Sequence, residues 1–147
     1  MKYFLLLVML SLGTVLQAQQ PEVFSKNNLA INGFDPVAYF TEGKPVKGND
    51  SLSMEWKHSK WVFSSKANLD SFKVNPEKYA PQFGGYCAYG MSRGYKAPTE
   101  GDAWSIVDGK LYLNYNVDVR TIWNKDQGKF IEKAVGNWKG VVHSKQE

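Results

Sequence analysis

The dipeptide Asp108-Gly109 constrains the fold more than any other local feature, because two short apolar runs flank it in the stretch AWSIVDGKLYLNY at 103–115. An Asp-Gly pair readily adopts the positive φ angles of a type I′ turn, whose twist matches that of two paired strands. The sequence therefore predicts a tight β-hairpin over 103–115.

Another hairpin, the first of the two in chain order, is predicted over 51–65, in the stretch SLSMEWKHSKWVFSS. Apolar residues alternate on both sides of the polar tetrad at 57–60, which is the period of a half-buried strand. The period then changes, and Ser65 is expected to cap a short helix that buries Leu69 and Phe72. The pair Asn75-Pro76 is expected to end that helix.

The remaining segments complete the predicted fold. The stretch 29–40 is expected to be extended with turns, and 81–94 contains too many glycines for a stable helix. Two C-terminal helical faces are indicated by the apolar residues Val119, Ile122, Trp123, Phe130, Ile131, Ala134, Val135 and Trp138. We expect an α+β fold: a small antiparallel sheet built from two hairpins, short helices packed on it, and a C-terminal amphipathic helix.

The first 18 residues have the features of a signal peptide: Lys2, an apolar block and the small residue Ala18. The apolar block is too short to span a bilayer, so cleavage is favoured over a stable membrane anchor. We expect a signal peptide at 1–18, a leader at 19–27, one domain at 28–140 and a polar tail at 141–147. The protein would then be exported, either periplasmic or secreted.

The charge pattern argues against nucleic acid as a partner. The net charge is only +4, and the basic residues are scattered rather than gathered into a run. The chain also lacks a nucleophile elbow, a His-Glu zinc helix and a phosphate loop, so an enzyme is not favoured. The expected partner is a metal ion or a small molecule, and the sequence does not identify a partner protein.

Cys87 is the only cysteine, so this thiol cannot form an intramolecular disulfide. It lies among glycines and tyrosines in YAPQFGGYCAYGMSRG at 79–94. One interpretation is a thiolate ligand or reactive thiol in an aromatic-lined loop. The other is a small buried hydrophobic residue whose neighbouring glycines only form turns.

Met91 and His58 are the other candidate metal ligands. Met91 follows Cys87 by four residues, so on a helical turn both sulfurs would face the same way and share a copper ion. Ordinary packing is the alternative for Met91. His58 lies in the turn of the first hairpin, where it is either solvated or, if the tip folds towards Cys87, a ligand.

Four further residues are candidates for ligand binding. Asp35 either caps a turn or is a buried functional charge, with Tyr39 as a nearby hydroxyl donor. Tyr86 and Tyr89 flank Cys87, where they would either line a pocket or pack into the core.

Taken in order, these elements resemble the YHS-domain family, in particular its small exported members. The resemblance rests on GFDPVAYF, NPEKYAPQFGGYCAYG and AWSIVDGKLYLNY, and it extends from about Asn28 to Trp138. It implies a metal site, with copper as the leading candidate, formed by cysteines after the second hairpin strand and at the start of the helix. The corresponding residues here are Ser64, Ser65 and Asn68, so a soft-metal site would have to be rebuilt around Cys87.

The sequence thus predicts an exported small binding protein of YHS type that binds copper or another soft metal through the Cys87 loop. Two alternatives remain. One is a module that binds a small organic ligand or a partner protein through aromatic side chains. The other is a thiol-dependent redox partner.

Overall fold

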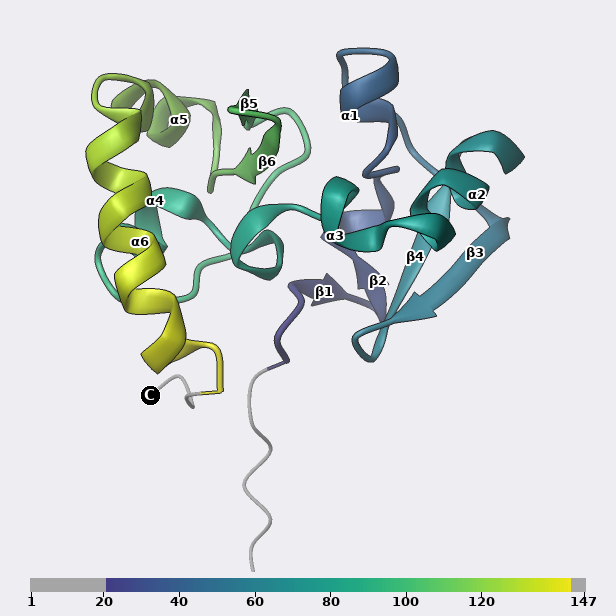
Figure 1. The fold of residues 1–147 in the computed structure, drawn as a ribbon, viewed down its shortest axis with the longest axis horizontal. Helices are drawn as coiled ribbons and strands as arrows, with labels where there is room; N and C mark the ends of the chain where they lie inside the picture. Colours follow the sequence, from purple (N-terminus) through teal and green to yellow (C-terminus); the bar gives the residue numbers. More distant parts are fainter. Residues whose placement is uncertain (1–20, 144–147) are drawn as a thin grey trace, which may run out of the picture.

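A four-stranded sheet and a two-stranded sheet form the framework of residues 21–143, the part of the chain that this computed structural model describes (Figure 1). Helices pack around both sheets, which confirms the expected α+β class. The expected signal peptide at 1–18 and the end of the expected tail, 144–147, lie outside the described residues. Within the described range, none of the helices has both the length and the apolar character needed to cross a membrane.

The first predicted hairpin forms one side of the four-stranded sheet. Its strands β3 and β4 pair in antiparallel fashion, and the turn residues Lys57 and His58 both have positive φ. Strand β2 pairs with β4 in parallel and with β1 in antiparallel fashion. The order is β1-β2-β4-β3, with bounds β1 (Ser25–Lys26), β2 (Leu29–Ala30), β3 (Asn49–Trp56) and β4 (Ser59–Phe63).

Short helices cover this sheet. Ser65 caps α2 by accepting a hydrogen bond from the Asn68 N–H at 3.1 Å, and Pro76 begins the next helix, so both predicted boundaries are confirmed. Phe72 of α2 packs against Trp61 and Phe63 of β4, with ring centroids 5.2 and 5.1 Å away. The helices are η1 (Ile31–Gly33), α1 (Ala38–Thr41), α2 (Lys66–Val74) and α3 (Pro76–Tyr79).

The C-terminal half contains the second predicted hairpin and a group of helices. Asp108 and Gly109 have φ angles of 51° and 74°, as a type I′ turn requires. The elements are η2 (Gln82–Gly85), α4 (Ala88–Ser92), β5 (Trp104–Val107), β6 (Lys110–Leu113), α5 (Val117–Asn124) and α6 (Gln127–Val141). The glycine-rich segment, which was not expected to form a stable helix, contributes the five-residue helix α4.

Strand β6 joins the two halves because its two faces belong to different cores. Leu111 and Leu113 pack into the cluster around the four-stranded sheet. Tyr112, on the opposite face, packs with Met91 and Trp123 in the second cluster. The two hairpins form separate sheets instead of the single sheet expected from the sequence, because neither β5 nor β6 pairs with a strand of the four-stranded sheet.

Residues 21–27, which were expected to be a leader, are part of the fold. Val23 is fully buried, and the Phe24 N–H donates to the Gly84 carbonyl at 2.8 Å. The Tyr86 hydroxyl donates to the Pro21 carbonyl at 2.8 Å. These partners lie about 60 residues away in sequence, so no local pattern in the segment could indicate them.

This docking gives a stability prediction. Gly84 has a φ of +63°, and a Cβ atom there would overlap the Glu22 carbonyl. Gly84→Ala should therefore lower the free energy of unfolding by more than about 2 kcal/mol, measured by urea denaturation. As a matched control, Gly136→Ala in α6 meets nothing within 4 Å and should raise it by up to about 1 kcal/mol. Equal effects of the two substitutions would contradict the docked arrangement of residues 21–27.

Candidate functional site

A buried carboxylate, Asp35, organises the region that the resemblance associates with metal. Asp35 is fully buried and lies just before α1. Its Oδ1 accepts the backbone N–H groups of Val37 and Ala38 at 2.8 and 3.2 Å. Its Oδ2 accepts the Ser64 N–H, the Ser64 hydroxyl and the Asn68 amide at 2.8, 2.7 and 2.8 Å. All five bonds come from donors, which suits the acceptor-only, ionised form of the side chain.

The residues at the family's cysteine positions are therefore engaged with other groups. Ser64 and Asn68 donate to Asp35, and the Ser65 hydroxyl caps α2. Hydroxyl and amide groups are poor ligands for a soft metal, and here both hydroxyls and the Asn68 NH₂ group already have partners. The donor set at these three positions does not fit copper.

Tyr39, in α1, is also fully buried. Its hydroxyl donates to the Gly101 carbonyl at 2.8 Å. Burial, followed by the negative charges of Asp102 and Asp35, raises the pKa of this phenol well above its ordinary value. Tyr39 is thus a neutral donor that links α1 to the loop before β5.

Cys87 is 1% exposed and caps α4 with its sulfur. The Sγ atom accepts the N–H groups of Gly90 and Tyr115 at 3.4 and 3.2 Å, and the thiol lies 3.5 Å from Asn114 Oδ1. Burial raises the pKa of the Cys87 thiol, although the backbone hydrogen bonds of Gly90, Tyr115 and Tyr89 act in the opposite direction. The neutral thiol is therefore the favoured form at neutral pH.

Asn114 is the polar residue nearest to this thiol, and it is fully buried. Its Oδ1 also accepts the Tyr89 N–H at 3.0 Å, which fixes the orientation of the amide because a rotated NH₂ group would face another donor. The Nδ2 atom has no hydrogen-bond partner among the described residues. An unpaired buried donor is costly, and such groups are often retained at binding sites.

A hollow of about 260 Å³ lies beside Cys87, and we call it the tyrosine pocket. Tyr95 packs closely on Gly90, where a Cβ atom would approach the Tyr95 ring to 3.0 Å. Two of the pocket's tyrosines are about half exposed, Tyr95 at 47% and Tyr115 at 49%. The pocket is lined by Cys87, Tyr89, Tyr95, Ala97, Tyr115 and Val119.

The other sequence-predicted residues do not line this pocket. Met91 is fully buried in the second core, and His58 is exposed at the tip of the β3–β4 hairpin, which Figure 1 shows far from α4. Tyr86 donates its hydroxyl to Pro21, and burial raises the pKa of Tyr86 to about 12. Of the seven predicted site residues, only Cys87 and Tyr89 come together at a hollow.

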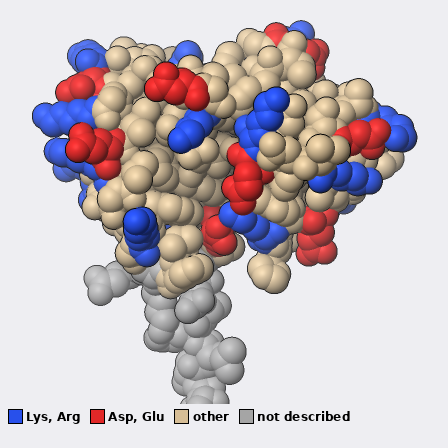
Figure 2. All heavy atoms as spheres, in the orientation of Figure 1, with Lys and Arg blue, Asp and Glu red and all other residues tan. Residues whose placement is uncertain are grey.

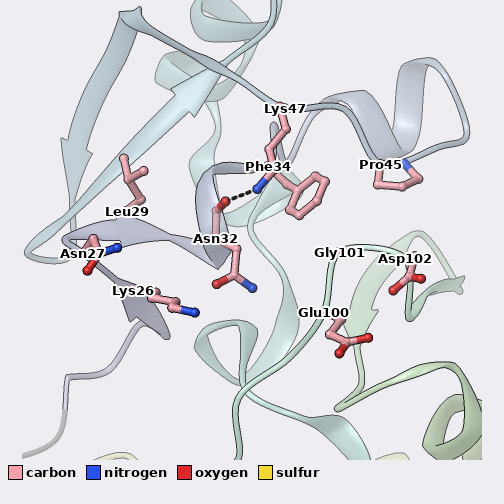
Figure 3. Close-up of a pocket in the computed structure, with 10 residues that line it drawn as sticks. All are labelled: Lys26, Asn27, Leu29, Asn32, Phe34, Pro45, Lys47, Glu100, Gly101 and Asp102. Carbon is pink, nitrogen blue, oxygen red and sulfur yellow. Dashed lines mark hydrogen bonds between the residues drawn. The ribbon is translucent and has the colours of Figure 1, made fainter.

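A second hollow, an open cleft of about 620 Å³, lies between the β1–η1 region and the loop before β5 (Figure 3). Asn32 connects its two sides, because the Asn32 amide donates to the Thr99 carbonyl at 2.8 Å. Phe34 contacts Gly101 so closely that a Cβ atom at Gly101 would overlap the Phe34 ring. The cleft is lined by Lys26, Asn27, Leu29, Asn32, Phe34, Pro45, Lys47, Glu100, Gly101 and Asp102.

Neither hollow brings together a conventional metal-ligand set. Over residues 21–143, no group of three or more His, Cys, Asp or Glu side chains is placed to hold a metal ion. At Cys87 the sulfur is approached by two N–H groups, whose positive ends would also face a bound cation.

The described residues form a small α+β fold whose surface hollows include the tyrosine pocket and the open cleft. Residues 37–83, about a third of the chain, match the family model of the YHS domain. The match is consistent with a metal-binding role, although it contains Ser64, Ser65 and Asn68 and ends before Cys87. Searches of curated proteins and of solved structures found no match to the chain.

The sequence did not single out several residues that shape these hollows. Tyr95 and Tyr115 lie next to Cys87 only in the folded chain. Asn114 comes five residues after the Asp-Gly turn. The one available signal was the recurrence of tyrosine around the glycine-rich segment. The open cleft had no local signal, since its charged residues come from segments more than 50 residues apart.

The Asp35 network predicts a large stability effect. Asp35→Asn replaces an acceptor oxygen with an NH₂ group that must face donors, so the free energy of unfolding should fall by about 2–4 kcal/mol. Thermal and urea denaturation would measure this change. Asp70→Asn, at an exposed ion pair with Lys66, serves as the control and should have little effect. A mild effect of Asp35→Asn would mean that the five hydrogen bonds do not hold this region together.

Proposed function

We propose that this chain is an exported binding protein of YHS type whose tyrosine pocket holds a small uncharged aromatic molecule. The observation that carries the proposal is the tyrosine pocket itself, where Cys87, Tyr89 and Tyr95 from one stretch and Tyr115 from another border one hollow. Two of those tyrosines remain about half exposed. A rigid aromatic wall with polar hydroxyl tips is a common way of binding small ligands.

The chemistry of the lining favours a neutral ligand. No charged side chain lines the pocket, and the raised pKa of the Cys87 thiol keeps that group uncharged at neutral pH. A volume of about 260 Å³ suits a ligand with one aromatic ring. Ring-on-ring contacts with tyrosine and contact with the soft sulfur would supply affinity.

Copper or another soft metal bound at Cys87 is the alternative, and the YHS match favours it. The sulfur of Cys87 is the one soft atom at the pocket, so such a site would be open and of modest affinity. A thiol-dependent redox role is less favoured, because a raised thiol pKa reduces the fraction of reactive thiolate.

The ligand proposal is tested with p-cresol as the probe. We expect saturable binding, on the order of 0.1–1 mM for a ligand of this size, measured by NMR chemical-shift titration. Bound p-cresol should also slow alkylation of Cys87 by iodoacetamide.

Val119→Trp should fill the pocket and weaken p-cresol binding at least about tenfold, because the same space cannot hold both rings. Val135→Trp, on the exposed face of α6, is the matched control and should leave binding unchanged.

An anaerobic Cu(I) titration separates the two candidates. Stoichiometric Cu(I) binding by the unaltered protein that is lost in Cys87→Ser, together with no p-cresol binding, would support the metal and overturn the aromatic ligand. Weak Cu(I) binding that is equal in both proteins, together with p-cresol binding, would support the aromatic ligand.

Export is a separate part of the proposal, and it rests on the apolar block and Ala18 near the N-terminus. Expressed with all 147 residues in a bacterial host, the protein should accumulate outside the cytoplasm with a mass that corresponds to a chain beginning at Gln19. Leu6→Arg should retain the uncleaved chain in the cytoplasm, whereas Leu6→Ile should not. Full-length protein in the cytoplasm without either substitution would contradict export.

A further inference from the structure

The open cleft in Figure 3 has charges of opposite sign on opposing walls. Lys26 and Lys47 come from the N-terminal half of the fold, whereas Glu100 and Asp102 come from the loop before β5. All four residues are exposed to solvent. Figure 2 shows that acidic and basic side chains are otherwise interspersed over the face of the molecule that it draws.

These four charges do not neutralise one another. The ion pairs within residues 21–143 involve Lys57, Lys60 and Lys66, and none of them joins a lysine of the cleft to Glu100 or Asp102. Lys47 instead donates to the Asn32 carbonyl at 2.6 Å and lies 4.0 Å from the centre of the Phe34 ring. Both signs of charge therefore remain available to a molecule in the cleft.

The walls are held at a fixed separation. Asn32 contacts both of them, because its carbonyl accepts from Lys47 while its amide donates to Thr99, next to Glu100. Asn32 itself has a φ of 59° and follows Ile31 at 44°, a conformation that a β-branched residue adopts only when its surroundings impose it. The two charged walls are thus preorganised rather than formed when a ligand binds.

The charge pattern selects the class of ligand. A simple anion would be attracted by the lysines but repelled by Glu100 and Asp102, and a simple cation would meet the reverse situation. A molecule that carries both a negative and a positive group can place each group against the wall of opposite charge. We propose that the cleft binds a zwitterion of the size of a free amino acid or dipeptide, with its carboxylate towards Lys26 and Lys47 and its ammonium towards Glu100 and Asp102.

Two apolar side chains are also among the lining residues of the cleft. Leu29 and Phe34 offer a surface on which the side chain of an amino acid can pack. A volume of about 620 Å³ lies within the usual range for small-molecule sites. This site is separate from the tyrosine pocket, because the two hollows share no lining residue.

Glycyl-L-phenylalanine is the probe for the test, compared with its N-acetyl and C-terminal amide forms. Each blocked form lacks one of the two charges and is otherwise nearly unchanged. Because the charged groups are exposed and screened by salt, we expect each blocked form to bind about 3- to 10-fold more weakly at low ionic strength. Calorimetry measures the affinities, and NMR shifts at residues 26, 32, 47 and 100–102 locate the site.

The variant Glu100→Gln assigns the ammonium end of the ligand. It should weaken binding of the free dipeptide severalfold but should not weaken binding of the N-acetyl form, since that form has no ammonium group and its carboxylate is repelled by Glu100. Glu132→Gln, on α6 and exposed, removes the same charge elsewhere and should change neither affinity. The proposal is overturned if the three probes bind equally or not at all, if the shifts map elsewhere, or if Glu132→Gln has the same effect as Glu100→Gln.

Discussion

The first half of this fold depends on the hydrogen bonds that the buried carboxylate of Asp35 accepts. This carboxylate is fully buried, so it loses its hydration and must regain hydrogen bonds from the protein. It does so by fixing the start of α1 through Val37 and Ala38 and the junction of β4 with α2 through Ser64 and Asn68. One side chain thereby determines how a helix, a strand end and a second helix meet.

This network also shows how the segment that matches the YHS model is held together with Ser64, Ser65 and Asn68 at the positions where the resemblance implies cysteines. A metal ion would draw these chain segments together through its coordination bonds, and Asp35 draws two of them together through hydrogen bonds. Ser64 and Asn68 suit this role because each can donate, which a thiolate cannot do towards a carboxylate. The segments thus remain joined without coordination bonds at these positions.

Local signals in the sequence were enough for the elements with regular periods. The Asp108-Gly109 turn, the β3–β4 hairpin and the Ser65 cap all depend on residues within a few positions of one another, and each was predicted. Strands β1 and β2 were missed because each has only two residues and exists through pairing with distant segments. The sequence indicated Cys87 and Tyr89 for the tyrosine pocket but missed the rest of its lining and the whole open cleft, since Cys87 meets Tyr115, and Lys26 faces Glu100, only in the folded chain.

The two hollows differ in chemistry, but one segment borders both. Cys87 donates its backbone N–H to Ala97, which lines the tyrosine pocket, and Asn32 donates to Thr99 two residues later, beside the charged cleft. Asn114 accepts the Glu100 N–H with its carbonyl while its side chain contacts Cys87. The stretch from 95 to 103 is therefore a shared wall, held from one side by the N-terminal half and from the other by the end of β6. The shapes of both hollows therefore depend on the position of this one stretch.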